Sequence, residues 1–216
     1  MTELKSDIVF WKKALEELPN SYKTWFEEEE KYLRENVDSK TKLLDVACGD
    51  GKGLKMVHDI ISEGIGVDFD EDAVKASNES FKDSSNIKII WGDAANLPFE
   101  ENSFDAVICI GSFCNSGDNK LKWLEEMKRV SKENGKIILS VYSEDAFDER
   151  IKFYKKLKLP IEKIEGTKVF LDDEKIKDNI SEQFSKDELE DLFDKSKLKL
   201  TEIIKWGIGY ICKLNK

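Results

Sequence analysis

The chain has 216 residues, of which 40% are hydrophobic and 37% charged, and its formal net charge is −10 at pH 7. This length suits one domain with a substantial core. No apolar run is long enough to span a membrane, and no basic segment followed by an apolar one precedes the first helix. Phosphate contacts need clustered Lys and Arg, so the acidic balance disfavours a nucleic-acid partner. We therefore expect a cytoplasmic protein with no membrane partner.

Helical spacing of apolar residues begins near the N-terminus and is interrupted at Pro19. We predict two helices within residues 1–38, an N-terminal helical cover, with Ser21 capping the second. Tyr22 and Trp25 lie in the first turns of that second helix. They fit the apolar stripe of a helix that faces the core.

An apolar strand at residues 42–47 contains one carboxylate, Asp45, although buried strands rarely contain one. Glycines at alternate positions follow this strand: Gly49, Gly51 and Gly53. They let the backbone turn tightly and approach a ligand closely. Residues 53–62 then show helical spacing, so the turn leads into a helix N-terminus, where free backbone N–H groups bind anionic groups.

The next predicted strand, residues 64–68, ends in Asp68, which lies 19 positions after Gly49. An acid about 20 residues beyond a glycine turn holds ribose hydroxyls in nucleotide-binding sheets. The glycine spacing does not match the dinucleotide fingerprint, and Asp45 would repel a pyrophosphate. This pattern predicts a nucleoside cofactor that carries a cationic group.

Further strands and helices alternate along the chain, which is typical of a parallel sheet with helices on both faces. They are predicted at residues 71–81, 87–91, 104–110, 119–131 and 135–142. A helix capped by Ser185 then leads into a hairpin at residues 198–206 and 208–214. We expect an α/β, doubly wound, mainly parallel seven-stranded sheet with a C-terminal antiparallel hairpin. Ligands in such folds bind beyond the carboxyl ends of the strands.

These motifs resemble those of the class I S-adenosylmethionine-dependent methyltransferases, which are small Rossmann-like domains. The segment Asp45-Val46-Ala47-Cys48-Gly49-Asp50-Gly51 resembles their first motif, with Ala47 in place of a glycine. The resemblance implies S-adenosylmethionine as cofactor, S-adenosylhomocysteine as product, and no metal. It also implies that Asp93 meets the adenine amino group and that Ala94 supplies a backbone N–H. In small proteins of this family N-terminal helices often cover the cofactor, so Tyr22 and Trp25, with Phe26, form either the core-facing stripe or a lid, and the sequence favours neither.

The resemblance implies a cofactor site along the ends of the first four strands. Its expected residues are Asp45, Ala47, Cys48, Gly49, Gly51, Asp68, Phe69, Asp93, Ala94, Ile110 and Gly111. Contacts with the methyl acceptor are expected from Tyr22, Trp25, Ser112, Cys114, Asn115 and Tyr142. The catalytic residue stays unknown, and the candidate bases are Tyr22, Asp118, Tyr142, Glu144 and Tyr154. The four cysteines form no Cys-x-x-Cys pair and the chain has one histidine, so no metal-ligand cluster is visible.

We interpret residues 1–216 as a single methyltransferase domain whose cofactor-binding core is residues 42–142. Residues 144–182 form an insertion beside the edge where substrate must enter, and we expect them to select the substrate. They contain a charged helix at 145–158 and a strand near 168–171. Residues 183–216 form the closing helix and hairpin.

The function we expect is methyl transfer from S-adenosylmethionine to a nitrogen or oxygen nucleophile of a small metabolite. Two alternatives stay open. One is a tRNA or rRNA methyltransferase, which a folded basic groove would favour. The other is a non-catalytic S-adenosylmethionine-binding protein, which tight cofactor binding behind a blocked entrance would favour. The sequence leaves the oligomeric state and any protein partner open.

Overall fold

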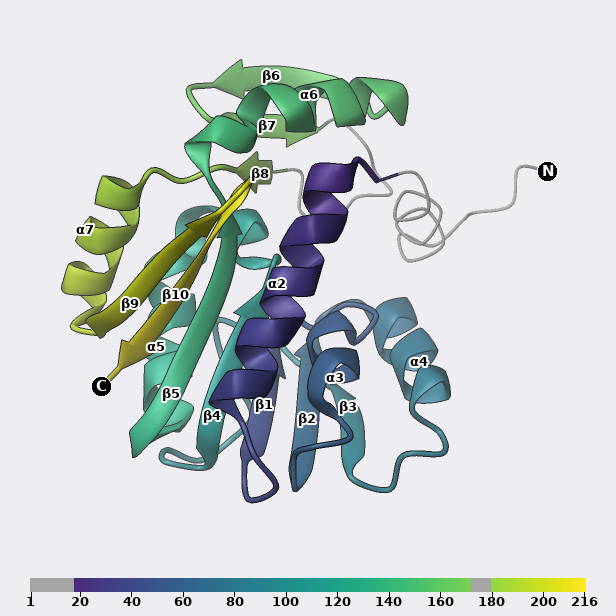
Figure 1. The fold of residues 1–216 in the computed structure, drawn as a ribbon, viewed down its shortest axis with the longest axis vertical. Coiled ribbons are helices and arrows are strands. Elements are labelled where there is room, and N and C mark those ends of the chain that lie inside the picture. The colour runs from purple at the N-terminus through teal and green to yellow at the C-terminus, as the bar shows by residue number, and fades with distance from the viewer. Residues whose placement is uncertain (1–17, 172–179) are drawn as a thin grey trace.

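The computed structural model describes residues 18–171 and 180–216. Its main sheet has seven strands in the order β3-β2-β1-β4-β5-β10-β9 (Figure 1). These strands are β1 (Lys42–Val46), β2 (Glu63–Asp68), β3 (Ile87–Trp91), β4 (Phe104–Ile110), β5 (Ser131–Tyr142), β9 (Lys199–Trp206) and β10 (Gly209–Asn215). The first five are parallel, and β10 pairs antiparallel with both β5 and β9. This confirms the doubly wound fold with its C-terminal antiparallel hairpin.

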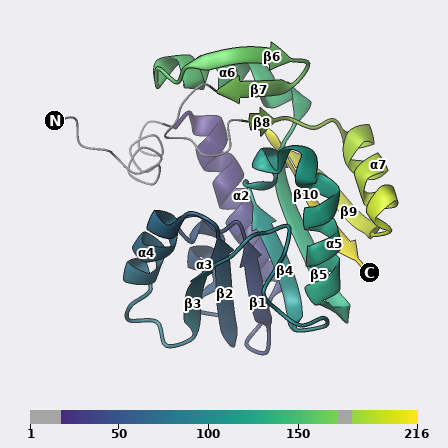
Figure 2. The same ribbon diagram turned by 180° about the vertical axis from the view of Figure 1, so that it is seen from behind.

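Helices cover both faces of the sheet, as Figures 1 and 2 show from opposite sides. One face carries α2 (Asn20–Asn36), α3 (Lys52–Val57) and α4 (Glu71–Ser80), and the other carries α5 (Lys120–Val130) and α7 (Lys186–Ser196). Two hydrophobic clusters fill the spaces between sheet and helices. Burial on both faces explains why the central strands are nearly continuous apolar runs.

Strand β4 shows how one strand serves both clusters. Val107 and Cys109 pack on the side of α5 and α7, whereas Ala106 and Ile108 pack on the side of α2 and α3. Successive side chains of a strand point to opposite faces, so this apolar run fills two cores at once. Asp105, at the start of the strand, accepts a hydrogen bond from the Lys42 backbone N–H and has a structural role.

Several predicted boundaries differ from the structure. Helix α2 begins at Asn20 with Pro19 at the N-cap and no side-chain cap, so the prediction of Ser21 as the cap is wrong. Ser21 lies within the helix, and its hydroxyl donates to Glu149. Helix α3 ends at Val57, five residues before its expected end. The helix predicted before Pro19 lies outside the described residues. The capping box that begins α7 at Ser185 is confirmed.

A smaller three-stranded antiparallel sheet lies beyond the carboxyl end of β5 (Figure 1). We use "cap" for this sheet and the helical segments that precede it, residues 144–171 and 180–182. Its elements are η3 (Glu144–Ala146), α6 (Phe147–Lys156), β6 (Ile161–Glu165), β7 (Lys168–Leu171) and β8 (Ile180–Glu182). The helix and β7 were predicted, but β6 and β8 were not. Among the described residues, no helix is both long and apolar enough to cross a membrane.

Candidate cofactor and acceptor site

The turn after β1 depends on glycine for two different reasons. Gly49 and Gly51 have φ values of +53° and +80°, in the left-handed region that disfavours other residues. A Cβ atom on Gly51 would lie 2.6 Å from Ser77 Oγ, whereas one on Gly49 would meet nothing within 4 Å. Gly51 therefore packs closely against α4, and Gly49 leaves its outer side open to a ligand. Ala47 also has a positive φ, +53°, at the position where the family motif has glycine.

Asp45 is a buried carboxylate with one oxygen that is not hydrogen-bonded to any described residue. It is only 2% exposed, and its Oδ2 atom has no hydrogen-bond partner within the described part of the chain. A Cβ atom on Gly53 would lie 2.6 Å from that oxygen. Burial raises the pKa of Asp45 to about 8, although the Leu54 N–H opposes the rise and nearby Asp68 adds to it. A cationic group beside Oδ2 would restore the charged carboxylate.

Asp68 ends β2 as predicted and is held against the glycine turn. Its carboxylate accepts the Gly49 N–H at 2.7 Å and the Asp70 N–H at 3.0 Å. Burial raises its pKa, and these two backbone donors oppose the rise. Each carboxylate oxygen keeps a further lone pair, so ribose hydroxyls can still donate to it. Next to it, the Phe69 carbonyl accepts the Trp91 indole N–H at 2.7 Å, and this tryptophan is 60% exposed.

Asp93 and Ala94 follow β3 at the same edge of the sheet, because the Gly92 N–H donates to the Asp68 carbonyl at 3.0 Å. The Asp93 carboxylate is exposed and accepts the Ala95 N–H at 2.8 Å, which forms a turn. Ala94 packs its side chain into the core. The structure therefore places Asp93 in a turn whose carboxylate faces outward.

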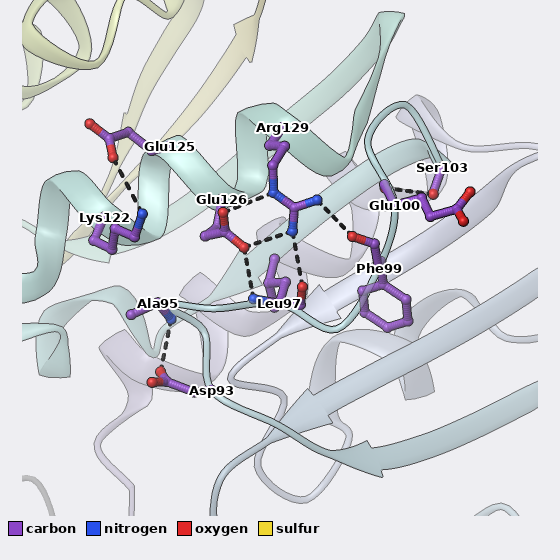
Figure 3. Close-up of polar contacts among 10 residues, drawn as sticks. All are labelled: Asp93, Ala95, Leu97, Phe99, Glu100, Ser103, Lys122, Glu125, Glu126 and Arg129. Carbon is purple, nitrogen blue, oxygen red and sulfur yellow. Dashed lines mark hydrogen bonds and ion pairs between the residues drawn. The ribbon is translucent and has the colours of Figure 1, made fainter.

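Helix α5 fixes the loop that carries Asp93 (Figure 3). Glu126 accepts the Leu97 N–H at 2.8 Å, and Arg129 donates to the carbonyls of Leu97 and Phe99 at 2.9 and 2.6 Å. Arg129 also forms an ion pair with Glu126 at 2.7 Å. These two side chains hold three backbone groups of the loop, and nothing in the sequence indicated that role.

The end of β4 supplies the edge that faces the cap. Ile110 packs into the core, and Gly111 follows it with a φ of +76° and open space beyond its Cα. Ser112 precedes the short helix η1 (Phe113–Asn115). The thiol of Cys114 is buried and contacts the Gly111 carbonyl at 3.1 Å. Cys48, by contrast, packs its side chain into the core on the α2 and α3 side.

The aromatic residues expected to meet the acceptor form a cluster in which Tyr22 and Trp25 are buried and Tyr142 is half-buried. The ring centroids of Tyr22 and Trp25 lie 5.8 and 4.8 Å from that of Tyr142 at the end of β5. The Tyr22 hydroxyl and the Trp25 indole N–H have no hydrogen-bond partner within the described residues. The structure agrees with both interpretations of Tyr22 and Trp25, the core-facing stripe and the lid. Their rings pack in the core, and they also lie where α2 meets the cap.

A buried ion pair that the sequence did not reveal joins α2 to the glycine turn. Lys52, the residue after Gly51, lies 2.6 Å from a carboxylate oxygen of Glu29. Glu29 is fully buried and also accepts the hydroxyl of Ser140 on β5. The Lys52 ammonium lies 3.2 Å above the ring centroid of Phe26. Burial lowers the Lys52 pKa, and Glu29 opposes that shift. Glu29 belongs to a run of four glutamates, so no pattern singled it out.

Arg150 on α6 was also missed, although the scarcity of arginine in this lysine-rich chain was an available signal. Its side chain is 5% exposed and stacks 3.4 Å above the ring centroid of Tyr142. It donates to the hydroxyls of Tyr154 and Ser181. The cap therefore places a cation directly against the aromatic cluster.

Three of the candidate bases, Tyr22, Tyr142 and Tyr154, are brought together around Arg150, and Asp118 and Glu144 have other surroundings. Asp118 is exposed, Glu144 lies 3.6 Å from the Lys205 ammonium, and the Tyr154 hydroxyl bonds with Ser181. Within residues 18–171 and 180–216, no group of three or more His, Cys, Asp or Glu side chains is arranged to hold a metal ion.

Comparison with known proteins agrees with this arrangement. Residues 44–139 match the methyltransferase domain family. A curated demethylmenaquinone methyltransferase of Staphylococcus saprophyticus is 37% identical over 146 residues, which are 65% of this chain and 61% of that protein. The chain thus spans less than two thirds of that relative's length.

The similarity to solved structures covers a larger part of the chain. The PH0226 protein of Pyrococcus horikoshii is 26% identical with a TM-score of 0.71, covering 97% of this chain and 93% of its own. An S-adenosylmethionine-dependent methyltransferase of Clostridium acetobutylicum shares the fold at 15% identity, with a TM-score of 0.68 and 92% of each chain covered. The family match is thus to a methyltransferase domain over residues 44–139, and the fold of the described chain is shared with a solved S-adenosylmethionine-dependent methyltransferase.

Proposed function

We propose that the protein transfers the methyl group of S-adenosylmethionine to a small organic acceptor. The observation that supports this best is Asp45, a buried carboxylate with an unpartnered oxygen beside a glycine turn. A buried carboxylate needs a cation or hydrogen-bond donors to stay charged. The ammonium of a methionyl group has that chemistry, and a pyrophosphate does not.

The surrounding residues fit the rest of this cofactor. Asp68 would accept ribose hydroxyls, and Asp93, in its fixed loop, would accept the adenine amino group. Gly49 and Gly111 leave open space where a side chain would otherwise stand. Bound S-adenosylmethionine supplies an electrophilic methyl group on a sulfonium, so the protein mainly has to bind and orient the acceptor.

The aromatic cluster supports the positioning role. Tyr22, Trp25 and Tyr142 pack together against Ala146 of the cap, where they would exclude water and limit the orientations of an acceptor. Alignment of reacting atoms is worth several orders of magnitude in rate. A general base is needed only if the attacking nitrogen or oxygen must lose a proton.

A small acceptor is favoured over RNA. The curated relatives are named for demethylmenaquinone, which is a small molecule. The net charge of −10 opposes the phosphate contacts on which RNA affinity depends. A tRNA or rRNA acceptor and a non-catalytic binding protein are therefore outcomes for experiment to test.

The first experiment is calorimetric titration with S-adenosylhomocysteine. We expect micromolar binding by the wild type, loss of binding in Asp68→Ala, and no change in Asp72→Ala, which alters an exposed carboxylate on α4. Absence of wild-type binding would contradict the proposal. Methyl transfer from labelled S-adenosylmethionine is then measured with small-molecule pools and with total tRNA, and binding without any transfer would favour the non-catalytic alternative.

A further inference from the structure

The three arginines of the chain have very different surroundings. Arg34 pairs with both carboxylate oxygens of Asp59 at 2.8 Å, and Arg129 pairs with Glu126 at 2.7 Å. Arg150 is the most deeply buried of the three, yet no carboxylate of the described residues lies within ion-pairing distance of it. A buried guanidinium without a counter-ion is strongly unfavourable unless other groups stabilise it.

The groups around Arg150 are polar but uncharged. Its Nη2 atom donates to the hydroxyls of Tyr154 and Ser181, and its plane stacks on Tyr142. Its Nε–H is buried and has no acceptor within the described residues. Gln183, whose amide nitrogen lies 3.5 Å from the Ser181 hydroxyl, has a buried side-chain oxygen that also lacks a partner in the described part of the chain. Hydrogen-bonding capacity therefore remains unused around the cation.

The carboxylates next to Arg150 and Ser181 in the sequence have other partners. Glu149, next to Arg150 in the chain, accepts the Ser21 hydroxyl. Glu182, next to Ser181, forms ion pairs with Lys120 at 2.5 Å and Lys168 at 3.3 Å. Within residues 18–171 and 180–216, the missing negative charge is thus not supplied by the groups that contact Arg150, which are Tyr142, Tyr154 and Ser181.

This cation lies at the acceptor side of the proposed cofactor site. Cys114, whose thiol contacts the Gly111 carbonyl, lies close enough to Arg150 that the guanidinium charge opposes the rise in its thiol pKa caused by burial. Tyr142, beneath the guanidinium, lies two residues after Ser140, whose carbonyl accepts the Gly111 N–H at 3.0 Å. The rings of Tyr22, Tyr142 and Tyr154 gather around the cation, and flat rings suit a planar ligand.

We propose that Arg150 binds an anionic oxygen of the methyl acceptor, which is therefore a small planar acid with a carboxylate or an ionised phenol. The proposal rests on the methyltransferase function proposed above. Arginine suits this task because its planar fork matches a carboxylate and remains charged. Arg150 would then determine which acceptors are used by pairing with their charge.

Direct binding of model anions tests the proposal. The protein is first saturated with S-adenosylhomocysteine and then titrated with benzoate, with 4-nitrophenolate, or with uncharged methyl benzoate. We expect one or both anions to bind saturably and methyl benzoate not to bind. Binding of benzoate alone identifies a carboxylate, and binding of the nitrophenolate alone identifies a phenolate.

Three variants show whether Arg150 carries that binding. Arg150→Met should weaken anion binding at least about tenfold, Arg150→Lys should weaken it less because a charge remains, and Arg34→Met should leave it unchanged. All three should bind S-adenosylhomocysteine as the wild type does. The Tm of Arg150→Met should stay equal or rise, because Tyr154 and Ser181 remain bonded to each other at 2.7 Å when the cation is removed.

The outcomes separate the two proposals. If the wild type fails to bind S-adenosylhomocysteine, the methyltransferase function falls and this inference with it. If the wild type binds S-adenosylhomocysteine but neither anion, or if Arg150→Met binds anions equally well, only the role of Arg150 is overturned. A clear fall in the Tm of both Arg150 variants would assign Arg150 a structural role instead.

Discussion

Two regions, the parallel sheet with its glycine turn on one hand and the cap on the other, differ in how their buried polar groups are partnered. In the sheet and its helices, Glu29 pairs with Lys52, and Glu126 pairs with Arg129 and the Leu97 N–H. Where the cap meets the sheet, several buried polar atoms lack partners within the described residues, and they belong to Tyr22, Ser143, Glu144, Arg150 and Gln183. Buried polar groups are ordinarily satisfied. In the sheet and its helices the exceptions among the described residues are Trp25 Nε1, Asp45 Oδ2 and Ser77 Oγ, the last two beside the glycine turn, whereas where the cap meets the sheet they are spread over five side chains. This difference indicates that a ligand's polar groups are needed at both places, and by more side chains at the junction.

We expect the largest difference between the two regions when one partner of a buried ion pair is removed from each and the unfolding free energy is measured. Lys52→Met removes the one ionic partner that fully buried Glu29 has among the described residues and should cost about 3–5 kcal/mol of unfolding free energy. Lys120→Met should cost about 1 kcal/mol, because Glu182 keeps Lys168. Urea unfolding of both variants measures the difference.

A double variant sharpens this test. Glu29→Gln combined with Lys52→Met removes both charges, so its stability should recover toward that of the wild type. Equal losses in the two single variants would refute the contrast between the regions.

Two glycines of positive φ offer a second comparison. In Gly51→Ala, the new methyl would meet Ser77 Oγ at 2.6 Å and Phe81 at 2.7 Å, and we expect a loss of about 3 kcal/mol. Gly166→Ala, in the turn between β6 and β7, adds a methyl to open space at a φ of +60° and should cost about 1 kcal/mol. Thermal unfolding reports both, and a larger loss at Gly166 would reverse the comparison.

Binding of S-adenosylhomocysteine should depend on pH through Asp45. Burial raises the pKa of the free carboxyl to about 8, and a ligand ammonium would lower that pKa in the complex. Binding then releases a proton, so affinity should rise by up to about tenfold per pH unit as pH increases toward 8. Calorimetry in buffers of different ionisation enthalpy measures the proton directly.

Asp45→Asn is the matched control for that titration. Its affinity should be weaker and independent of pH over the same range. A wild-type affinity that stays constant up to pH 8 would mean that no cation meets Asp45.

The smallest expected effect concerns Ala47. Glycine would relieve left-handed strain of about 1 kcal/mol but would gain a similar amount of chain entropy in the unfolded state, so Ala47→Gly should change stability by less than about 1 kcal/mol. Ala73→Gly, within helix α4, should cost about 1 kcal/mol. A loss in Ala47→Gly as large as that in Ala73→Gly would show that Ala47 is not strained.

The sequence predicted the parallel region well because its determinants are local. Apolar runs, the glycine turn and the acid at the end of β2 each lie within a few residues, and the parallel arrangement brings those strand ends to one edge. The positions of Asp45, Asp68 and Gly111 therefore followed from the pattern alone.

The remaining features depend on contacts between distant segments. Glu29 meets Lys52 and Ser140 across 23 and 111 positions, and Arg150 meets Ser181 across 31. Strand β6 is mostly exposed and charged, so it lacks the apolar alternation that marks a half-buried strand. Which charged residues become buried is decided by tertiary packing, which no periodicity in one chain reveals.

All four cysteines are free and buried, and burial raises the pKa of each thiol, to about 12 at Cys212. A thiol reagent can therefore react only after a segment opens, because thiolate and access are both required. Cys114 lies under the cap and Cys109 lies inside the central strand. The rate at which Cys114 is labelled therefore reports the opening of the acceptor side. The rate at which Cys109 is labelled reports the opening of the whole sheet.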